Sequence, residues 1–389
     1  MVSPRVRTAG SIRDGLIEYD LADVSHHYVQ VTPQGWSVSK DHQLKFLRNK
    51  LNAPQVTPIT SKKDLLTLLK PYVNASADDR ILFTVWLVQA LCESNHPALL
   101  MIGERGSSKS TLTKMARSII DPSFLKTGVL PQKMDDLITT LTNSYFVAFD
   151  NMDEITKAQS DLFCSAITGA NASKRALYTT NELAVFELHN TLIFNGLDVA
   201  PAESDLADRC LLLKLQHISE EKRQIDSTIT QSFKNDLPEI MGNIFSVLSE
   251  AMKIYPTLSP QRLPRMSEAY LDMLSIAMAL GISEAKFEKI FFSNLQALNK
   301  ARSNIAIVQA VREYMTSGLV PGRSLVGTVT EVYKKISTNY SGSKSDLPQS
   351  ASHFSRKLRN EYNALYAAGY TVNIDDTPAD GTHIKIIKN

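Results

Sequence analysis

The sequence predicts an α/β protein with a parallel sheet, preceded by a small β-rich segment and followed by helical segments. Two observations predict this class. Short apolar stretches at 98–102, 145–149, 191–194 and 210–215 alternate with helical stretches, and such continuous apolar runs are typical of parallel strands buried on both faces. Residues 219–299 show helical patterns without a strand signal, which indicates a separate helical part after the sheet.

Four parts are expected along the chain. Alternating apolar and polar residues at 15–20 and 28–32 predict strands near the N-terminus, and the stretch from Pro54 to Pro58 resembles a linker. The predicted parts are a β-rich segment with its linker at 1–58, the core at 59–218, a helical lid at 219–299 and a winged-helix-like domain at 300–389.

Composition narrows the class of protein. Of the 389 residues, 43% are hydrophobic and 21% are charged, as in an ordinary folded chain of more than one domain. The longest largely apolar run, 81–92, is too short to cross a bilayer, and the N-terminus lacks a signal-peptide core. We therefore expect a cytoplasmic protein without membrane contact. None of the three cysteines falls in C-x-x-C spacing, which argues against a disulfide framework and a zinc site.

The loop after the strand at 98–102 nearly matches a phosphate-binding motif. Residues 101–113 read MIGERGSSKSTLT, which fits G-x-x-x-x-G-K-[ST] except that Ser108 replaces the last glycine. In such loops backbone N–H groups at a helix start point at the phosphates, and a lysine, here Lys109, reaches the outer phosphates. We expect Ser108 to have a negative φ, where a Cβ is tolerated, so that the loop still binds nucleotide. The predicted ATP-contacting residues are Gly103, Glu104, Arg105, Gly106, Ser107, Ser108, Lys109, Ser110 and Thr111.

Two further strand ends support a nucleotide site. Asp150 ends an apolar strand 41 residues after Lys109, where its carboxylate and the Ser110 hydroxyl can hold Mg²⁺. Asn195 ends the next apolar strand and is expected to polarise the attacking water beside the γ-phosphate. An ordinary strand-end turn for Asp150 and a cap for Asn195 are the alternatives. Together these residues predict ATP and Mg²⁺ as cofactors.

Arg209 directly precedes the last apolar strand and has two interpretations. It is either an arginine finger that enters the site of a neighbouring subunit or a surface ion pair with Asp205 or Asp208. A finger stabilises transition-state charge and contributes about 10³–10⁵ in rate. The sequence leaves both interpretations open.

The general base is also open. The residue after Asp150 is Asn151, where ring ATPases of this type usually have a glutamate. An amide cannot accept the proton, but Asn151 can orient water, or the nearby Asp153 or Glu154 can serve as the base.

The C-terminal ninety residues are basic. From 300 to 389 the chain has 12 Lys and Arg against 7 Asp and Glu, a net charge of +5, whereas the remainder carries −3. A helix with one apolar face at 350–365 precedes two alternating segments around 375–381, and this order predicts a winged helix that binds DNA. A small packing domain with a solvated basic face is the alternative. The candidate DNA contacts here are His353, Arg356, Lys357, Arg359 and Lys385.

Several motifs carry a family resemblance. The stretches are GERGSSKST at 103–111, IDPS at 120–123, VAFDN at 147–151, RALYT at 175–179, IFNG at 193–196, DLADR at 205–209 and RLPRM at 262–266. In these the chain resembles ATP-binding proteins of prophages and other bacterial mobile elements, which often carry an upstream primase-like region. It is more distantly similar to AAA+ helicases of the minichromosome-maintenance and superfamily-3 kinds. The resemblance implies a ring ATPase, expected to be a homo-hexamer, that acts on single-stranded or forked DNA, with Arg265 as a second sensor arginine in the lid.

Two departures from these helicases matter. Their DNA-contacting hairpin usually has Lys or His at its tip, but here the expected tip, 179–182, offers no positive charge. Lys174 and Arg175 at its base can substitute. Residues 1–55 resemble at most the tail end of a primase domain, so we expect priming to come from a separate protein.

Three functions remain in competition. The first is an ATP-dependent DNA helicase or translocase in replication of a phage or mobile element. The second is a nucleotide-gated initiator or loader without processive unwinding, favoured by the neutral hairpin tip and by Asn151. The third is a small-molecule kinase, which predicts a compact monomer and leaves the basic C-terminus and Arg209 unexplained.

Overall fold

The computed structural model divides into two compact units. The first comprises residues 1–199 and 209–292, and the second comprises 200–208 and 293–389. The structure describes residues 7–40, 46, 48–104, 106–124, 128–152, 155–175, 183–196, 204–218, 221, 225–301, 306–318, 320, 324–342, 344, 347–375 and 382–389. Within these ranges no helix is both long enough and apolar enough to cross a membrane.

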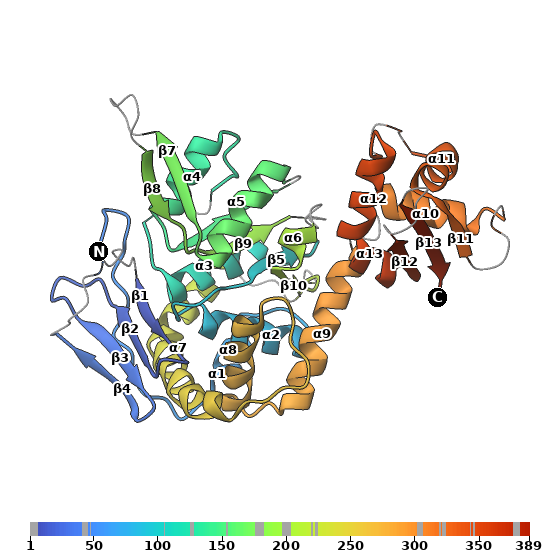
Figure 1. Ribbon diagram of the computed structural model, residues 1–389. Coiled ribbons are helices and arrows are strands. Elements are labelled where there is room, and N and C mark those ends of the chain that lie inside the picture. The colour runs from blue at the N-terminus through green and yellow to red at the C-terminus, as the bar shows by residue number, and fades with distance from the viewer. Residues whose placement is uncertain are drawn as a thin grey trace. The chain divides into compact units, whose positions relative to one another are not determined.

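Three sheets and their flanking helices make up the first unit (Figure 1). Its strands are β1 Thr8–Ser11, β2 Leu16–Asp20, β3 Tyr28–Thr32, β4 Gly35–Ser39, β5 Ala98–Ile102, β6 Phe146–Phe149, β7 Asn171–Arg175, β8 Leu183–Glu187, β9 Thr191–Asn195 and β10 Cys210–Lys214. Its helices are α1 Leu65–Leu69, α2 Ala77–Gln89, α3 Lys109–Ile120, α4 Met134–Thr142, α5 Lys157–Thr168, α7 Asp226–Ile254, the 3₁₀ turn η2 Tyr255–Thr257 and α8 Ser267–Ala279, and α9 Glu284–Ala301 begins in it.

The central sheet is parallel and has the strand order β10-β5-β9-β6. All of β6 and β9 is buried, and α3 packs against both strands while α2 contacts β10. Because β9 lies between β5 and β6 and pairs with both in parallel, the carboxyl ends of the three strands lie at one edge of the sheet. In parallel α/β sheets this carboxyl edge is where ligands bind. The predicted α/β class with a parallel sheet is confirmed.

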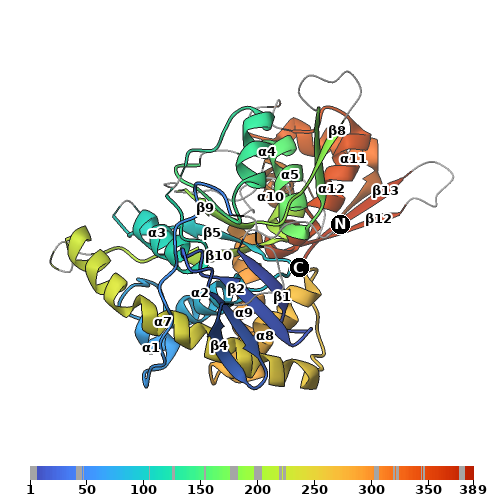
Figure 2. The same ribbon diagram turned by 90° about the vertical axis from the view of Figure 1, so that its left-hand side faces the viewer.

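The four N-terminal strands form an antiparallel sheet in sequential order. Helix α7 packs against β3 and β4, and Figure 2 shows it beside β4. Beside the sheet, the buried Arg7 guanidinium donates to Asp121 Oδ1 at 3.0 Å and to the Pro122 carbonyl at 2.8 Å. These hydrogen bonds compensate the buried guanidinium charge and connect the residue before β1 to the residues after α3.

The second unit has its own core and its own three-stranded sheet. Its elements are α6 Ser204–Ala207, the end of α9, α10 Ala306–Thr316, β11 Ser324–Thr328, α11 Val329–Asn339, α12 Ala351–Asn360, α13 Tyr362–Ala367, β12 Tyr370–Asp375 and β13 His383–Lys388. The sheet order is β11-β13-β12, with all pairs antiparallel. The strand pair predicted on either side of 375–381 is thus confirmed, and α10 to α13 cover the sheet over one hydrophobic core.

Candidate nucleotide-binding site

The loop between β5 and α3 turns through two left-handed residues. Gly106 has φ +83°, a conformation that glycine adopts without strain, and Ser108 has φ +67° and ψ +26°. The expectation of a negative φ at Ser108 is therefore wrong. The chain leaves the strand and starts α3 within six residues, and the left-handed turn directly precedes the first helical residue, Lys109. A Cβ in this conformation costs about 1–2 kcal/mol, so Ser108 is a strained substitute for the motif's glycine. Arg105 lies outside the described residues.

Ser108→Gly is expected to raise the free energy of unfolding by about 0.5–1 kcal/mol, because glycine has no Cβ penalty at positive φ and loses part of that gain through its more flexible unfolded chain. Urea denaturation of the two proteins measures the difference. The matched control is Ser118→Gly in the interior of α3, which should lower stability by a similar amount. A destabilised Ser108→Gly protein would show that the left-handed turn carries no strain.

Lys109 and Ser110 are the first two residues of α3. The Lys109 ammonium is expected to contact phosphate and the Ser110 hydroxyl to contact the metal. The Lys109 ammonium donates to the carbonyl oxygens of Gly103 and, at 3.1 Å, Glu104. Partial burial lowers the pKa of Lys109, and the Asp150 carboxylate opposes this shift. Ser110 Oγ donates to Asp150 Oδ2 at 2.9 Å, so α3 and the end of β6 bring the predicted magnesium pair together. Hydroxyl and carboxylate oxygens are ligands that Mg²⁺ prefers, and these residues fit the ion.

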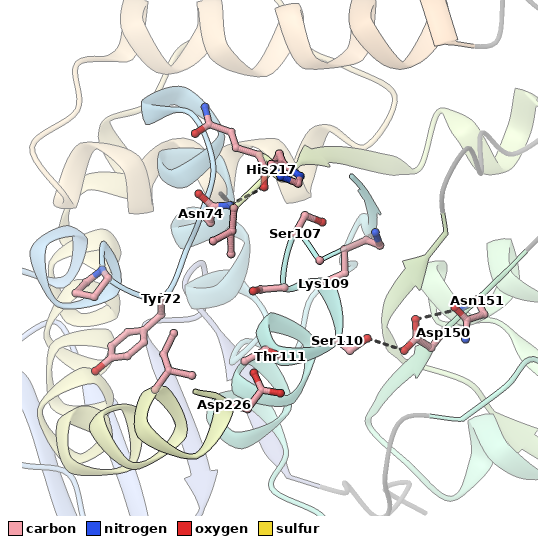
Figure 3. A pocket seen from close by; sticks show the side chains of 16 residues that line it. Tyr72, Asn74, Ser107, Lys109, Ser110, Thr111, Asp150, Asn151, His217 and Asp226 are labelled. Atoms are coloured by element: carbon pink, nitrogen blue, oxygen red, sulfur yellow. Dashed lines mark hydrogen bonds between the residues drawn. The ribbon is translucent and has the colours of Figure 1, made fainter. Parts of the chain in front are cut away.

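An open cleft of about 700 Å³ surrounds this pair and is called the loop cleft below. Its lining residues are Pro71, Tyr72, Asn74, Gly106, Ser107, Ser108, Lys109, Ser110, Thr111, Asp150, Asn151, Gln216, His217, Ile218, Asp226 and Ile229. Figure 3 shows Ser110 and Asp150 facing each other, with Tyr72 and Asp226 on the opposite side. The volume falls within the range of ordinary ligand sites.

Half of this lining was missed from the sequence. Asn74 Nδ2 donates to the Gln216 carbonyl at 2.6 Å, and Gln216 N donates back to the Asn74 carbonyl at 2.9 Å. This pair joins the segment before α2 to the segment after β10 at the side of the phosphate loop. His217 Nδ1 lies 3.2 Å from Glu104 Oε2. These segments have no motif, and only the sheet order brings them to the loop.

Asn195 lies at the end of β9, next to β6, and does not line the loop cleft. It is fully buried, and its Nδ2 donates to Thr113 Oγ1 of α3 at 2.9 Å. Its backbone carbonyl accepts from Met152 N at 2.9 Å. Asn195 therefore ties together α3 and the chain after β6, and its expected role in positioning water stays a prediction.

Asn151 lines the loop cleft and has a left-handed backbone with φ +54°. Its N–H lies 3.0 Å from Asp150 Oδ1, which orients the carboxylate beside Ser110. The alternative bases Asp153 and Glu154 lie outside the described residues.

Arg209 and Arg265 come together in a second, smaller cleft of about 260 Å³, called the arginine cleft below. It is lined by Asn95, Thr168, Arg209, Arg265, Met266, Ser267, Glu268 and Ala269. Neither arginine lines the loop cleft of the same chain. The structure thus pairs two residues that were predicted separately, from the start of β10 and from the segment before α8.

The predicted DNA contacts on α12 fall into two groups. His353, Arg356 and Arg359 are exposed. Lys357 is half-buried, and its Nζ lies 3.3 Å from Oε1 of the fully buried Glu361. This ion pair compensates the Lys357 charge within the unit. The remaining candidates are Lys385, exposed on β13, and Lys174 and Arg175 at the end of β7; the expected hairpin tip at 179–182 lies outside the described residues.

Fold and site together define a mixed α/β protein whose parallel sheet carries a loop–helix junction and a strand-end carboxylate at one edge. Residues 64–278, more than half of the chain, match the family described as actinomycete integrative conjugative element replication protein, and the chain belongs to that family. It is a replication-associated protein of a mobile element, as the resemblance implied. The likeness to superfamily-3 and minichromosome-maintenance ATPases stays a prediction.

Two solved structures are similar to this chain at low sequence identity. No curated protein matches the sequence. Among solved structures, the chain is similar to the A form apo structure of the NrS-1 C-terminal region, with a TM-score of 0.40, 11% identity, and coverage of 98% of this chain and 96% of that one. A second structure of that region, residues 305–718, gives a TM-score of 0.36, 11% identity, and coverage of 95% and 96%.

Proposed function

We propose that this replication protein is an AAA+-type, DNA-dependent ATPase that works as a helicase or translocase on the DNA of its element. The observation that carries the proposal is the contact between Ser110 and Asp150 beside Lys109, at the carboxyl edge of a parallel sheet. A lysine, a hydroxyl and a strand-end carboxylate in this arrangement are the protein groups that phosphoryl-transfer sites of this kind use.

Each group has a separate task in this proposal. The backbone N–H groups of the loop and the start of α3 bind phosphate oxygens. Lys109 exchanges the carbonyls of Gly103 and Glu104 for phosphate, which is a stronger, charge-assisted acceptor. Ser110 and Asp150 would hold Mg²⁺, which neutralises charge on the β- and γ-phosphates when bound. Asn151 is the cleft-lining amide that can orient the attacking water.

The arginine cleft supports a site shared between subunits. Because Arg209 and Arg265 do not line the loop cleft of their own chain, a role at the phosphates requires a neighbouring copy. This fits the homo-hexameric ring expected from the family resemblance, with each arginine pair acting on the nucleotide of the next subunit. A small-molecule kinase predicts instead a monomer, which size-exclusion chromatography with ATP present would reveal.

The second unit supports DNA binding. Its order of helix, strand, three helices and a terminal strand pair, with β13 between β11 and β12, resembles the arrangement of a winged helix. In helix-turn-helix proteins the second helix of the motif enters the major groove, and here α12, the second helix after β11, exposes His353, Arg356 and Arg359. We therefore propose α12 as the DNA-contacting helix.

The double substitution of Arg356 and Arg359 by alanine is expected to weaken duplex binding. It should also reduce the slope of log K against log salt concentration by about 1.8, because each phosphate contact contributes about 0.9. Fluorescence anisotropy over a salt series measures the slope. The control is the double lysine variant, which keeps both charges and should keep the slope. An unchanged slope in the alanine variant would place the DNA on another face.

Two assays separate the helicase from the loader. The ATPase rate with and without single-stranded DNA tests DNA dependence, and strand displacement on a forked duplex tests unwinding. ATP-dependent displacement that is absent in Lys109→Ala supports the helicase. DNA-stimulated hydrolysis without displacement supports the loader. An ATPase rate that is the same with and without DNA contradicts both the helicase and the loader.

A further inference from the structure

Two tyrosines on α13 form an exposed aromatic pair in the second unit. Tyr362 is 43% exposed and Tyr366 is 59% exposed, and their rings stack with centroids 6.3 Å apart and an interplanar angle of 16°. The other large hydrophobic residue exposed in the described part of this unit is Val326 on β11. A paired aromatic surface in water is unlike the isolated exposed apolar residues of ordinary surfaces and indicates a binding surface.

The tyrosine pair follows the basic helix α12 directly in the chain. Glu361 N donates to the Lys357 carbonyl and Leu365 N donates to the Glu361 carbonyl, both at 2.9 Å, although Glu361, with φ −96° and ψ +16°, lies between the two helices. Residues four apart on one helix share a face, which places Tyr362 and Tyr366 in one row on α13, and Arg359 lies three residues before Tyr362. Phe354, Leu358 and Leu365 on the two helices are buried in the core.

We propose that this row binds single-stranded DNA, with unpaired bases stacking on Tyr362 and Tyr366 and backbone phosphates contacting Arg356 and Arg359. The inference rests on the proposed DNA binding of the second unit and names its substrate. Bases inside a duplex have both faces covered by neighbouring bases, so only unpaired bases can stack on the two tyrosine rings. Aromatic rings next to cations along one surface are the common design of single-strand binding sites.

The net charge of this part of the chain favours nucleic acid over a protein partner. Residues 300–389 carry 12 basic and 7 acidic side chains, and Lys357 is compensated internally by Glu361. Arg356 and Arg359 are exposed on α12, directly before the helix that carries the two rings. A hydrophobic protein-docking surface needs no such row of arginines, whereas a polyanion with stacking bases matches both features.

The test measures binding of the full chain to labelled oligo(dT) and to a blunt duplex of the same length by fluorescence anisotropy. The double substitution of Tyr362 and Tyr366 by alanine is expected to weaken oligo(dT) binding by about 5- to 150-fold for each stacked base. Duplex affinity should change less than about twofold, because stacking is lost but phosphate contacts remain. The double phenylalanine variant keeps both rings and should bind like the wild type. Val326→Ala controls for loss of an exposed apolar residue.

Each outcome decides the inference. Equal affinity of the alanine variant and the wild type for oligo(dT), or an equal loss for oligo(dT) and duplex, overturns base stacking while DNA binding by the second unit stands. A change in oligomeric state on size-exclusion chromatography with unchanged oligo(dT) binding assigns the rings to a protein contact and also overturns it. A wild-type chain that binds neither DNA contradicts the proposed function itself. Photocrosslinking of iododeoxyuridine-containing oligo(dT) should label Tyr362 or Tyr366.

Discussion

Lys109→Ala is expected to lower the rate of ATP hydrolysis by at least about 10²–10³-fold, because a preorganised charge aimed at the transferring phosphate contributes that much in a cleft. Lys109 is the first residue of α3, and its ammonium group donates to two backbone carbonyls. The substitution therefore removes a positioned cation and not a packing contact. Phosphate release with and without single-stranded DNA measures the rate, and calorimetry with ATP and Mg²⁺ measures binding.

Lys114→Ala is the matched control, since Lys114 is exposed on the same helix and does not line the loop cleft. It should hydrolyse ATP at the wild-type rate. Equal rates in Lys109→Ala and the wild type, or no affinity of the folded wild type for ATP and Mg²⁺, would contradict a phosphate site at this loop.

Arg209→Ala is expected to leave ATP binding intact and to reduce hydrolysis by about 10³–10⁵-fold, the usual contribution of an arginine that enters a neighbour's site. The structure places Arg209 in the arginine cleft with Arg265 and away from the loop cleft of its own chain. A residue that only forms a surface ion pair would have almost no effect on the rate.

Mixing two inactive variants makes this prediction specific. Lys109→Ala subunits have Arg209 but no working phosphate lysine, and Arg209→Ala subunits have the reverse. In a ring with shared sites, an Arg209→Ala subunit next to a Lys109→Ala subunit regains a complete site, so the mixture should hydrolyse ATP although neither variant does alone. If rings shown to contain both variants are as inactive as each variant alone, Arg209 does not act on the nucleotide of a neighbouring subunit. Mixing with wild type should give a loss that is not proportional to the mutant fraction.

Much of the core could be predicted because its signals are local. The run at 98–102 coincides with β5 and the run at 145–149 contains β6, since strands buried on both faces need continuous apolar residues. The Ser110–Asp150 contact followed from the same reasoning, because carboxyl ends of parallel strands share one edge.

The errors and omissions have a common cause in backbone geometry and long-range contacts. The sign of φ at Ser108 depends on how sharply the chain turns into α3. The pairing of Asn74 with Gln216, and of Lys357 with Glu361, depends on which segments the fold brings together. The hydrogen bond from the Asn195 amide to Thr113 of α3 likewise depends on the fold, and the expected role of Asn195 at the phosphates stays a prediction.

By itself the sequence determined the α/β class and the position of the loop that resembles a phosphate-binding motif. It also determined that Asp150 lies beside Ser110 and that the C-terminal part is basic and ends in a pair of strands. These depend on residue periodicity and on short motifs. Only the tertiary structure decided which loops complete the cleft, that Arg209 and Arg265 share a second cleft, and that the rings of Tyr362 and Tyr366 stack at the surface. Such contacts join residues far apart in sequence or across a helix junction, where periodicity carries no information about which side chains meet.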